Sequence, residues 1–327
     1  MCSSDLLAVL SAMSEIEAGR YDVALVVGVE EQKALPGDKS SVNQNAAAWQ
    51  GREGISCTFM WPAVFGLLAE EYAWRHGLDR SHLNRISEIN YSNAKRNPLA
   101  QTRGWKFTDL SFTDDDVANP LIEPGTRRQD CGQITDGAAV LVLCSDRFMR
   151  EHSARTGAEP SRTARILGWG HRNAGIRFLD KIEESRADTH VFPHVRDTVG
   201  DAFRRAAIPD VRALDGIETH DCFSVTEYMA IDHFGITAPG ESWKAVEDGT
   251  IEHGGSLPVN PSGGLIGGGH PVGATGARML LDAARQVEGR AGDTQVDGAR
   301  TFGTLNIGGS LATVASFEAV GAVLVVA

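Results

Sequence analysis

Two cysteines and two histidines in this sequence have neighbours that could make them reactive. His220 and Cys222 stand two residues apart in ETHDCF, between a short apolar run and a segment with apolar residues at helical spacing. This pattern places both side chains at the C-terminal end of a strand and the N-terminus of a helix. The unpaired N–H groups of a helix N-terminus stabilise a thiolate. The stretch can therefore hold a reactive thiol, although a buried cysteine and a structural histidine are the commoner finding.

His270 lies in the glycine-rich segment NPSGGLIGGGHPVGATGARM, residues 260–279. The segment does not match the phosphate-binding pattern G-x-x-x-x-G-K-[ST], and it lacks the preceding strand of a dinucleotide-binding loop. Because the segment has few side chains, its histidine and its backbone N–H groups can approach a ligand closely. Ser262 and Gly263, near its start, are predicted to contact the substrate.

The composition limits the class of protein. A length of 327 residues suggests about two domains, and 42% hydrophobic residues supply a sizeable core. The net charge is −12, from 31 basic and 43 acidic residues, and no basic tract alternates with aromatic residues. This balance argues against a nucleic-acid surface and against anionic membranes. Since no apolar run is long enough to span a membrane and no signal peptide or targeting tripeptide is present, we expect a soluble cytoplasmic protein.

The cysteines argue against a disulfide scaffold. Five are scattered along the chain, with no C-x-x-C pair: Cys2, Cys57, Cys131, Cys144 and Cys222. An odd number without paired spacing favours a reducing compartment over a disulfide framework or a structural zinc module. Cys57, Cys131 and Cys144 are predicted to be structural.

The order of predicted elements indicates an α/β protein with two halves. Residues 1–150 form the first half: a helix after Cys2, the apolar strand DVALVVGVE, and later the strand TDGAAVLVLCS. Between these strands, residues 31–130 form an inserted region of loops with two amphipathic helices, PAVFGLLAEEYAWRHG and HLNRISEINYSNAKRN. The second half, residues 151–327, repeats strands and helices and ends with two strand-like runs in TFGTLNIGGSLATVASFEA.

Four motifs occur in one order along the chain. They are Cys-Ser-Ser opening a helix at Cys2, His-Asp-Cys-Phe at 220–223, Gly-His-Pro followed by Gly-Ala-Thr-Gly at 269–276, and Asn-x-Gly-Gly at 306–309. The set resembles the thiolase superfamily, and His-Asp-Cys-Phe resembles its sterol-carrier-protein-type members. The resemblance covers the chain from Cys2 to its end. It implies a thiolase-like α/β fold of two related βαβαβ-type halves in an α-β-α-β-α arrangement of layers.

The resemblance also implies a role for each motif. Cys2 matches the nucleophile that carries the acyl group as a thioester, and His270 matches the histidine that accepts its proton and faces a substrate oxyanion. Cys222 matches the acid/base of the His-Asp-Cys-Phe members. His220 takes the place of the residue that holds a catalytic water at one oxyanion hole. Gly308 falls where a backbone N–H completes the second hole.

These roles imply an acyl-CoA C-acyltransferase that cleaves or forms 3-oxoacyl-CoA in lipid, fatty acid or sterol side-chain metabolism. Coenzyme A is then a substrate, with no permanently bound cofactor and no metal, and the family implies a homo-oligomer. Cleavage or formation of 3-oxoacyl-CoA is consistent with separate roles for the thiols of Cys2 and Cys222. A free thiol needs a helix terminus or a histidine to become nucleophilic, and an enolate needs both an oxyanion hole and a carrier for the α-proton.

Two departures from the family pattern leave alternatives open. Asp5 stands where the family usually has glycine, and its carboxylate suits the dipole of its own helix but would raise the pKa of a nearby thiol. Met1 directly precedes Cys2, so we expect the first half to lack the strands that usually come before the nucleophile. The alternatives are a thiolase-like aldolase that works with a small partner subunit, and a non-catalytic thiolase-like protein. A zinc site from His220, Cys222, His253 and His270 is disfavoured because their spacing matches no ligand pattern.

Overall fold

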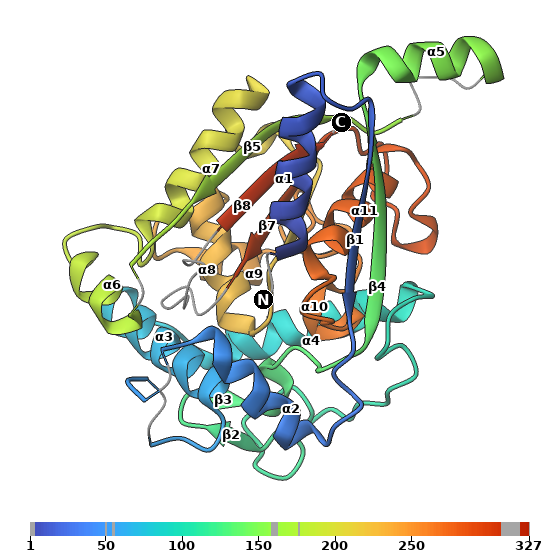
Figure 1. Ribbon diagram of the computed structural model, residues 1–327. Helices are drawn as coiled ribbons and strands as arrows, with labels where there is room; N and C mark the ends of the chain where they lie inside the picture. Colours follow the sequence, from blue (N-terminus) through green and yellow to red (C-terminus); the bar gives the residue numbers. More distant parts are fainter. Residues whose placement is uncertain are drawn as a thin grey trace.

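The computed structural model describes residues 4–49, 51–53, 56–157, 163–175, 177–308 and 321–326. Its strands form three sheets, and Figure 1 shows the two larger ones side by side with helices between them. The first sheet pairs β1 (Val23–Glu30) with β4 (Gly137–Cys144), and the smallest pairs β2 (Leu121–Glu123) with β3 (Thr126–Arg127). The four-stranded sheet has the order β5 (Ile166–Arg172), β8 (Gly321–Val326), β7 (Phe302–Ile307) and β6 (Gly216–Thr219).

The first sheet is an antiparallel pair with one buried face. Val26 of β1 and Leu141 of β4 are opposite each other in the register, and both are buried against helices α1 (Ser4–Glu17) and α11 (Thr275–Val287). Alternation along both strands then turns the intervening side chains to the outer face. Both strands and the helix after Cys2 were predicted from the sequence, and the structure confirms them.

The inserted region contains the helices that the sequence predicted. Helices α3 (Met60–His76) and α4 (Arg80–Arg96) correspond to the two amphipathic segments, and the short helix α2 (Gly37–Gln44) precedes them. Asp79 caps α4 by accepting a hydrogen bond from the backbone N–H of Ser81 (2.8 Å). Helix α5 (Asp146–Thr156) follows β4 and spans the predicted boundary between the halves.

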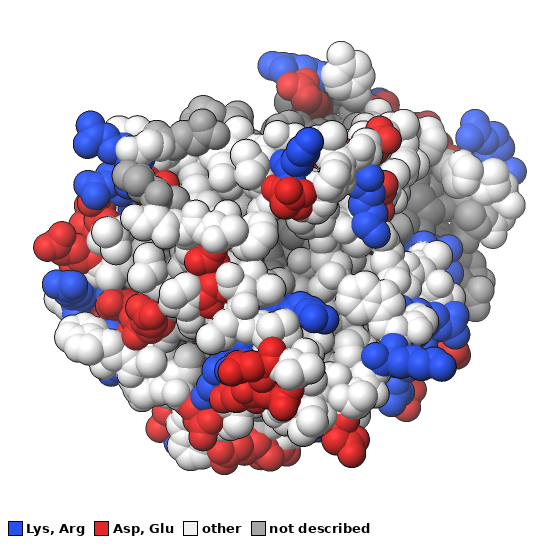
Figure 2. All heavy atoms as spheres, turned by 90° about the horizontal axis from the view of Figure 1, so that it is seen from below, with Lys and Arg blue, Asp and Glu red and all other residues white. Residues whose placement is uncertain are grey.

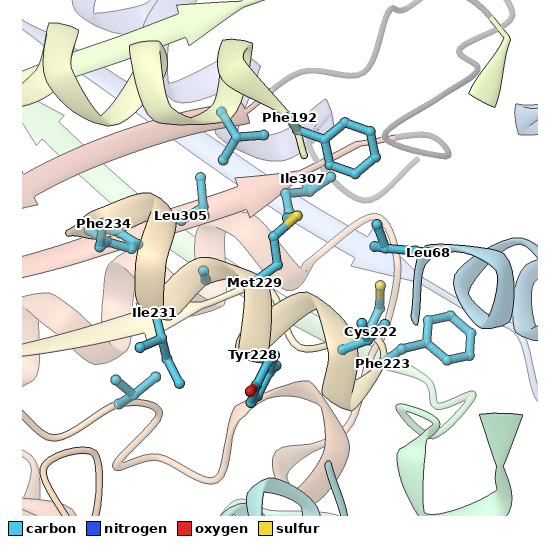
Figure 3. Close-up of a cluster of buried hydrophobic side chains, with 14 of the residues drawn as sticks. Leu68, Phe192, Cys222, Phe223, Tyr228, Met229, Ile231, Phe234, Leu305 and Ile307 are labelled. Atoms are coloured by element: carbon cyan, nitrogen blue, oxygen red, sulfur yellow. The ribbon is translucent and has the colours of Figure 1, made fainter. Parts of the chain in front are cut away.

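The main hydrophobic core lies in the second half and reaches helix α3. Helix α8 (Ser224–Phe234) is its centre, because every one of its side chains is buried. Figure 3 shows Cys222 and Phe223 at one end of this helix, and Tyr228 and Met229 farther along it. Helix α7 (Pro193–Ala206) packs against β5 and β8, while α6 (Phe178–Glu184), α9 (Ser242–Glu247) and α10 (Gly264–Gly268) complete the described helices of this half.

The layers of the described residues agree with the predicted fold except on the outer side of the first sheet. Helices α1 and α11 lie between the two larger sheets, and α7 and α8 cover the far side of the four-stranded sheet. Among the residues that the structure describes, the first half contributes two strands rather than a complete βαβαβ unit, and no helix covers the outer face of β1 and β4. The first of the two strand-like runs predicted near the C-terminus is β7; the second falls on residues 309–320, which lie outside the described residues.

Candidate active site

The turn between β6 and α8 carries His220 and Cys222, as the sequence predicted. β6 ends at Thr219 and α8 begins at Ser224, so the two side chains occupy the connection itself. The hydroxyl of Thr226, in the first turn of α8, donates to the carbonyl oxygen of His220 (2.7 Å). This hydrogen bond fixes the backbone of the turn against the helix.

A short extended segment connects this turn to His270. The backbone N–H of Gly132 donates to the carbonyl oxygen of Cys222 (2.7 Å), and the N–H of His270 donates to the carbonyl oxygen of Gln133 (3.1 Å). A side chain at Gly132 would stand 3.1 Å from the carbonyl oxygen of Cys222, so glycine permits this close approach. Residues far apart in the sequence are thereby held in one site.

Helix α11 sets the tautomer of His270. The hydroxyl of Thr275 donates to the carbonyl oxygen of Pro271 (3.0 Å), and its oxygen lies 2.7 Å from Nδ1 of His270. We assign the single hydrogen of the hydroxyl to the carbonyl of Pro271, so that the hydroxyl accepts from His270 and Nδ1 carries the imidazole proton. The lone pair is on Nε2, the nitrogen that can accept a proton.

Both histidines of the site are neutral. The rings of His220 and His270 meet edge to face with centroids 5.3 Å apart. Burial, with a smaller effect of Arg278, lowers the pKa of His220 to about 3. Burial also lowers the pKa of His270 well below its usual range, and His220 and Arg278 add to the effect. Two neutral imidazoles can accept protons and orient donors near neutral pH.

Buried carboxyl groups hold the glycine-rich segment beside the turn. Asp221 accepts hydrogen bonds from the backbone N–H groups of Leu265 (2.6 Å) and Ile266 (3.0 Å), in the first turn of α10. Gly264 has a φ of +61°, and a Cβ there would stand 2.3 Å from the carboxylate of Asp221, so only glycine fits. Asp221 therefore serves as an anchor, while its neighbours His220 and Cys222 face the cavity.

A cavity of about 720 Å³ opens onto the three reactive side chains. Its lining includes His220, Cys222 and His270, with an aromatic wall of Phe59, Trp61, Phe65 and Phe223. The charged side chains among the described lining residues are Lys33 and Arg128, and no Asp or Glu lines the cavity. The cavity therefore combines a mostly apolar surface with the thiol of Cys222, the imidazoles of His220 and His270, and two cations. The two cations stand out in a chain with a net charge of −12. On the face seen in Figure 2, acidic and basic side chains are interspersed among uncharged ones, with a basic side chain near the centre.

The structure brings together three of the predicted site residues. Cys2 lies outside the described residues, and Gly308 is buried directly after β7. Ser262 and Gly263 do not line the cavity: the hydroxyl of Ser262 donates to the carboxylate of Glu218 (2.7 Å), and Gly263 packs against Ala94. Direct substrate contact by Ser262 and Gly263 stays a prediction.

Sequence reasoning missed several residues of the cavity. Cys131, expected to be structural only, lines it, and burial followed by the charge of Asp130 raises the pKa of its thiol. Lys33 comes from a segment without regular periodicity, so nothing local marked it. Arg128 belongs to the basic pair Arg127-Arg128, which the sequence indicates as a solvated pair that could meet the phosphates of coenzyme A, and it was not predicted as a site residue. Thr275, which contacts His270 without lining the cavity, was also missed, although its place in the Gly-Ala-Thr-Gly motif was a usable signal.

Among the described residues, no group of three or more His, Cys, Asp or Glu side chains is placed to hold a metal ion. None of the described helices combines the length and apolarity needed to cross a bilayer.

Family models match both halves of the chain. The model described as "Thiolase, N-terminal domain" matches residues 1–107, and "Thiolase C-terminal domain-like" matches residues 179–317. The acetyl-CoA acetyltransferase of Methanothermobacter thermautotrophicus is 31% identical over 315 residues, which is 96% of this chain and 76% of that protein. The chain belongs to the thiolase family.

Other relatives and solved structures agree with this placement. Sterol carrier protein 2 of Bos taurus is 26% identical over 314 residues, covering 94% of this chain and 55% of that protein. A structure described as Ltp2-ChsH2(DUF35) aldolase matches with a TM-score of 0.74 and 20% identity, over 99% of this chain and 77% of that one. A monomeric SCP2-thiolase-like protein from Mycobacterium smegmatis matches with a TM-score of 0.69 and 17% identity, over 100% and 60%. At these identities the two structures support the thiolase-like fold alone.

Proposed function

We propose that this protein is an acyl-CoA C-acyltransferase that cleaves or forms 3-oxoacyl-CoA through an acyl-enzyme. The observation that carries the proposal is the joint placement of Cys222, His220 and the Nδ1-protonated His270 on one cavity. Two relatives that are 31% and 29% identical to this chain are named acetyl-CoA acetyltransferase, which also supports the proposal.

In the proposed cleavage, His270 accepts the proton of the Cys2 thiol through Nε2. The Cys2 thiolate attacks the 3-oxo carbon, and the bond between carbons 2 and 3 of the substrate breaks. The acyl group stays on Cys2 as a thioester, and the electron pair of the broken bond forms the enolate of acetyl-CoA. The thiol of a second coenzyme A then attacks the thioester and releases a shortened acyl-CoA.

Cys222 and His220 are proposed to act on the enolate. The thiol of Cys222 gives its proton to carbon 2, which converts the enolate to acetyl-CoA, and in synthesis the thiolate takes this proton back. Nδ1 of His220 is buried without a hydrogen-bond partner among the described residues. We propose that His220 orients a water at the enolate oxygen, and that the N–H of Gly308 serves the other oxyanion hole.

The cavity lining favours a thioester of coenzyme A. We propose that Lys33 and Arg128 bind its phosphates, since both are exposed cations at the cavity and neither forms an ion pair with a described residue. The aromatic wall would contact the apolar parts of the substrate. The predicted cytoplasmic location and the role in lipid metabolism stay proposals.

The test uses two cysteine variants and mass spectrometry. Cys222→Ala should still form an acyl adduct on Cys2 with acetyl-CoA, but its thiolysis of acetoacetyl-CoA should fall by about 10²–10⁴-fold, because general acid–base catalysis is lost. Cys2→Ala should form no adduct. Full thiolysis by Cys222→Ala would overturn the assigned proton carrier. A parent protein that forms no adduct and cleaves only a 3-hydroxyacyl-CoA would favour the aldolase alternative.

We also propose that the chain is a homo-oligomer, with the outer face of β1 and β4 in contact with a second copy. The side chains on this face are uncharged, and Leu25, Val27, Val29, Val140 and Val142 are exposed there. Apolar faces of this kind mark interfaces in soluble proteins, and this one meets no like charge in a symmetric contact. Sedimentation should give a dimer or larger species for the parent and a monomer for Val27→Lys. A folded parental monomer would refute the proposal.

A further inference from the structure

A buried carboxyl group joins the first helix of the chain to the helix that follows His270. Asp5 lies in the first turn of α1, with 4% of its surface exposed. Its Oδ2 accepts a hydrogen bond from the backbone N–H of Ala277 (2.5 Å), in the first turn of α11. The first N–H groups of a helix have no partner within the helix, and an acidic side chain there also interacts favourably with the helix dipole. Asp5 therefore caps α11 from another element.

Two glycines allow this carboxyl group to enter the junction. A Cβ on Gly28 of β1 would stand 2.8 Å from Cα of Ala274 and 3.1 Å from Oδ2 of Asp5. A Cβ on Gly276 would stand 2.9 Å from Oδ1 of Asp5. The absence of both side chains leaves room for one carboxyl group between α1, β1 and α11.

The capped end of α11 is the part that orients His270. Thr275, two residues before Ala277, accepts the hydrogen bond from Nδ1 of His270. The turn between them is also held from β1, because Glu30 accepts from the backbone N–H of Gly273 (2.9 Å). A displacement of the first turn of α11 would therefore move the hydroxyl that sets the His270 tautomer.

The second carboxyl oxygen faces a side chain of β7. Oδ1 of Asp5 and Nδ2 of Asn306 lie 2.9 Å and 3.0 Å from the point where a Cβ of Gly276 would stand. Oδ1 of Asp5 and Oδ1 of Asn306 are both buried without a hydrogen-bond partner among the described residues. A proton on Asp5 would supply the missing donor, and burial raises the pKa of this carboxyl group.

We propose that Asp5 is a positioning residue, which links α1, α11 and β7 and thereby holds His270 in its Nδ1-protonated orientation. Oδ2 accepts a hydrogen bond from Ala277. Nδ2 of Asn306 donates to the sulfur of Met279 (3.5 Å), so the proposed contact to β7 is donation from a protonated Oδ1 of Asp5 to Oδ1 of Asn306. Asparagine can make the same two contacts, with its oxygen on Ala277 and its NH2 on Asn306. Alanine can make neither.

The test compares Asp5→Ala, Asp5→Asn and the control Ser11→Ala, an exposed position on the same helix. The rate assay rests on the proposed function and follows thiolysis of acetoacetyl-CoA. Asp5→Ala should lower kcat by about 10- to 100-fold with KM within about twofold, since small misplacements of catalytic groups have effects of this size. Asp5→Asn and Ser11→Ala should stay within about threefold of the parent. Parental kcat in Asp5→Ala, or an equal loss in Asp5→Asn, would overturn the proposal.

A second readout does not depend on turnover. In nitrogen-15 NMR of histidine-labelled protein, the Nδ1-protonated signal of His270 should persist in Asp5→Asn and be lost or mixed in Asp5→Ala. An unchanged signal in Asp5→Ala would overturn the positioning role even if the parent catalyses no thiolysis, in which case the proposed function fails separately. Should Asp5→Ala not fold, Gly276→Ala replaces it, because its Cβ would displace Oδ1 of Asp5. A folded Gly276→Ala with parental kcat and parental His270 signal would also refute the inference.

Discussion

The hydroxyl of Thr275 is the contact through which helix α11 acts on His270, and Thr275→Val removes it with little change of shape. Thr275 is fully buried, and its oxygen lies 2.7 Å from Nδ1 of His270. Valine keeps the β-branched outline but removes the hydroxyl on α11 that accepts from Nδ1–H. We expect the imidazole to shift toward its other tautomer, in which Nε2 carries the proton and can no longer accept one.

The size of the effect follows from that unpaired group. A buried donor without a partner costs about 1–3 kcal/mol, and about 1.4 kcal/mol corresponds to a factor of ten in rate. If most of this free energy is lost from the state in which His270 has its reactive orientation, kcat falls by about 10- to 100-fold. Thr275 does not line the cavity, so KM for 3-oxoacyl-CoA should stay within about twofold.

The assay is steady-state thiolysis of acetoacetyl-CoA at saturating coenzyme A, with Thr198→Val as the matched control. Thr198 is also fully buried in a helix and donates to the carbonyl oxygen four residues earlier, that of His194 (2.7 Å), outside the cavity lining. We expect Thr198→Val to keep parental kcat while losing a similar amount of thermal stability. A Thr275→Val protein with parental kcat would refute the assignment of His270 as the base oriented by α11. An equal loss in both variants would show that general destabilisation causes the effect.

Three further predictions concern thiols, charge and packing. Brief iodoacetamide treatment near neutral pH should label Cys2 before Cys131, because burial raises the pKa of the Cys131 thiol; faster labelling of Cys131, seen by mass mapping, would contradict this. Burial raises the pKa of Glu227 to about 8. The unfolded chain loses this proton near pH 4.3, whereas the folded protein keeps it, so the free energy of unfolding falls as the pH rises from about 4.3 to about 8. Glu227→Gln should therefore gain thermal stability over the parent by an increasing margin from pH 5 to pH 8, and a pH-independent difference would argue against a protonated Glu227. In helix α3, Gly66→Ala should lower the free energy of unfolding in urea by more than ~2 kcal/mol, because its Cβ would stand 2.1 Å from a backbone oxygen. In helix α7, the Cβ of Gly200→Ala meets no atom within 4 Å, so this variant should raise the free energy of unfolding by up to ~1 kcal/mol.

Local pattern in the sequence was enough for the elements that carry the chemistry. The apolar run before His220 predicted a strand, the apolar spacing after Cys222 predicted a helix, and the structure has β6 and α8 there. Helices α3 and α4 were likewise predicted, because their periodicity of about 3.6 residues is a property of the segment alone. Four motifs in one order also indicated the thiolase family, which the comparisons confirm.

The tertiary structure decided which of these elements share a cavity and which side chains serve them. No local pattern shows that Gln133 pairs with His270, or that Cys131, Lys33 and Arg128 face the same space. Asp5 makes the same point: its own helix suggested a dipole contact within α1, but its carboxyl group also caps α11, 272 positions later. Propensity and amphipathicity act over a few residues, whereas such contacts depend on the packing of whole elements, which brings distant side chains together only once the chain has folded.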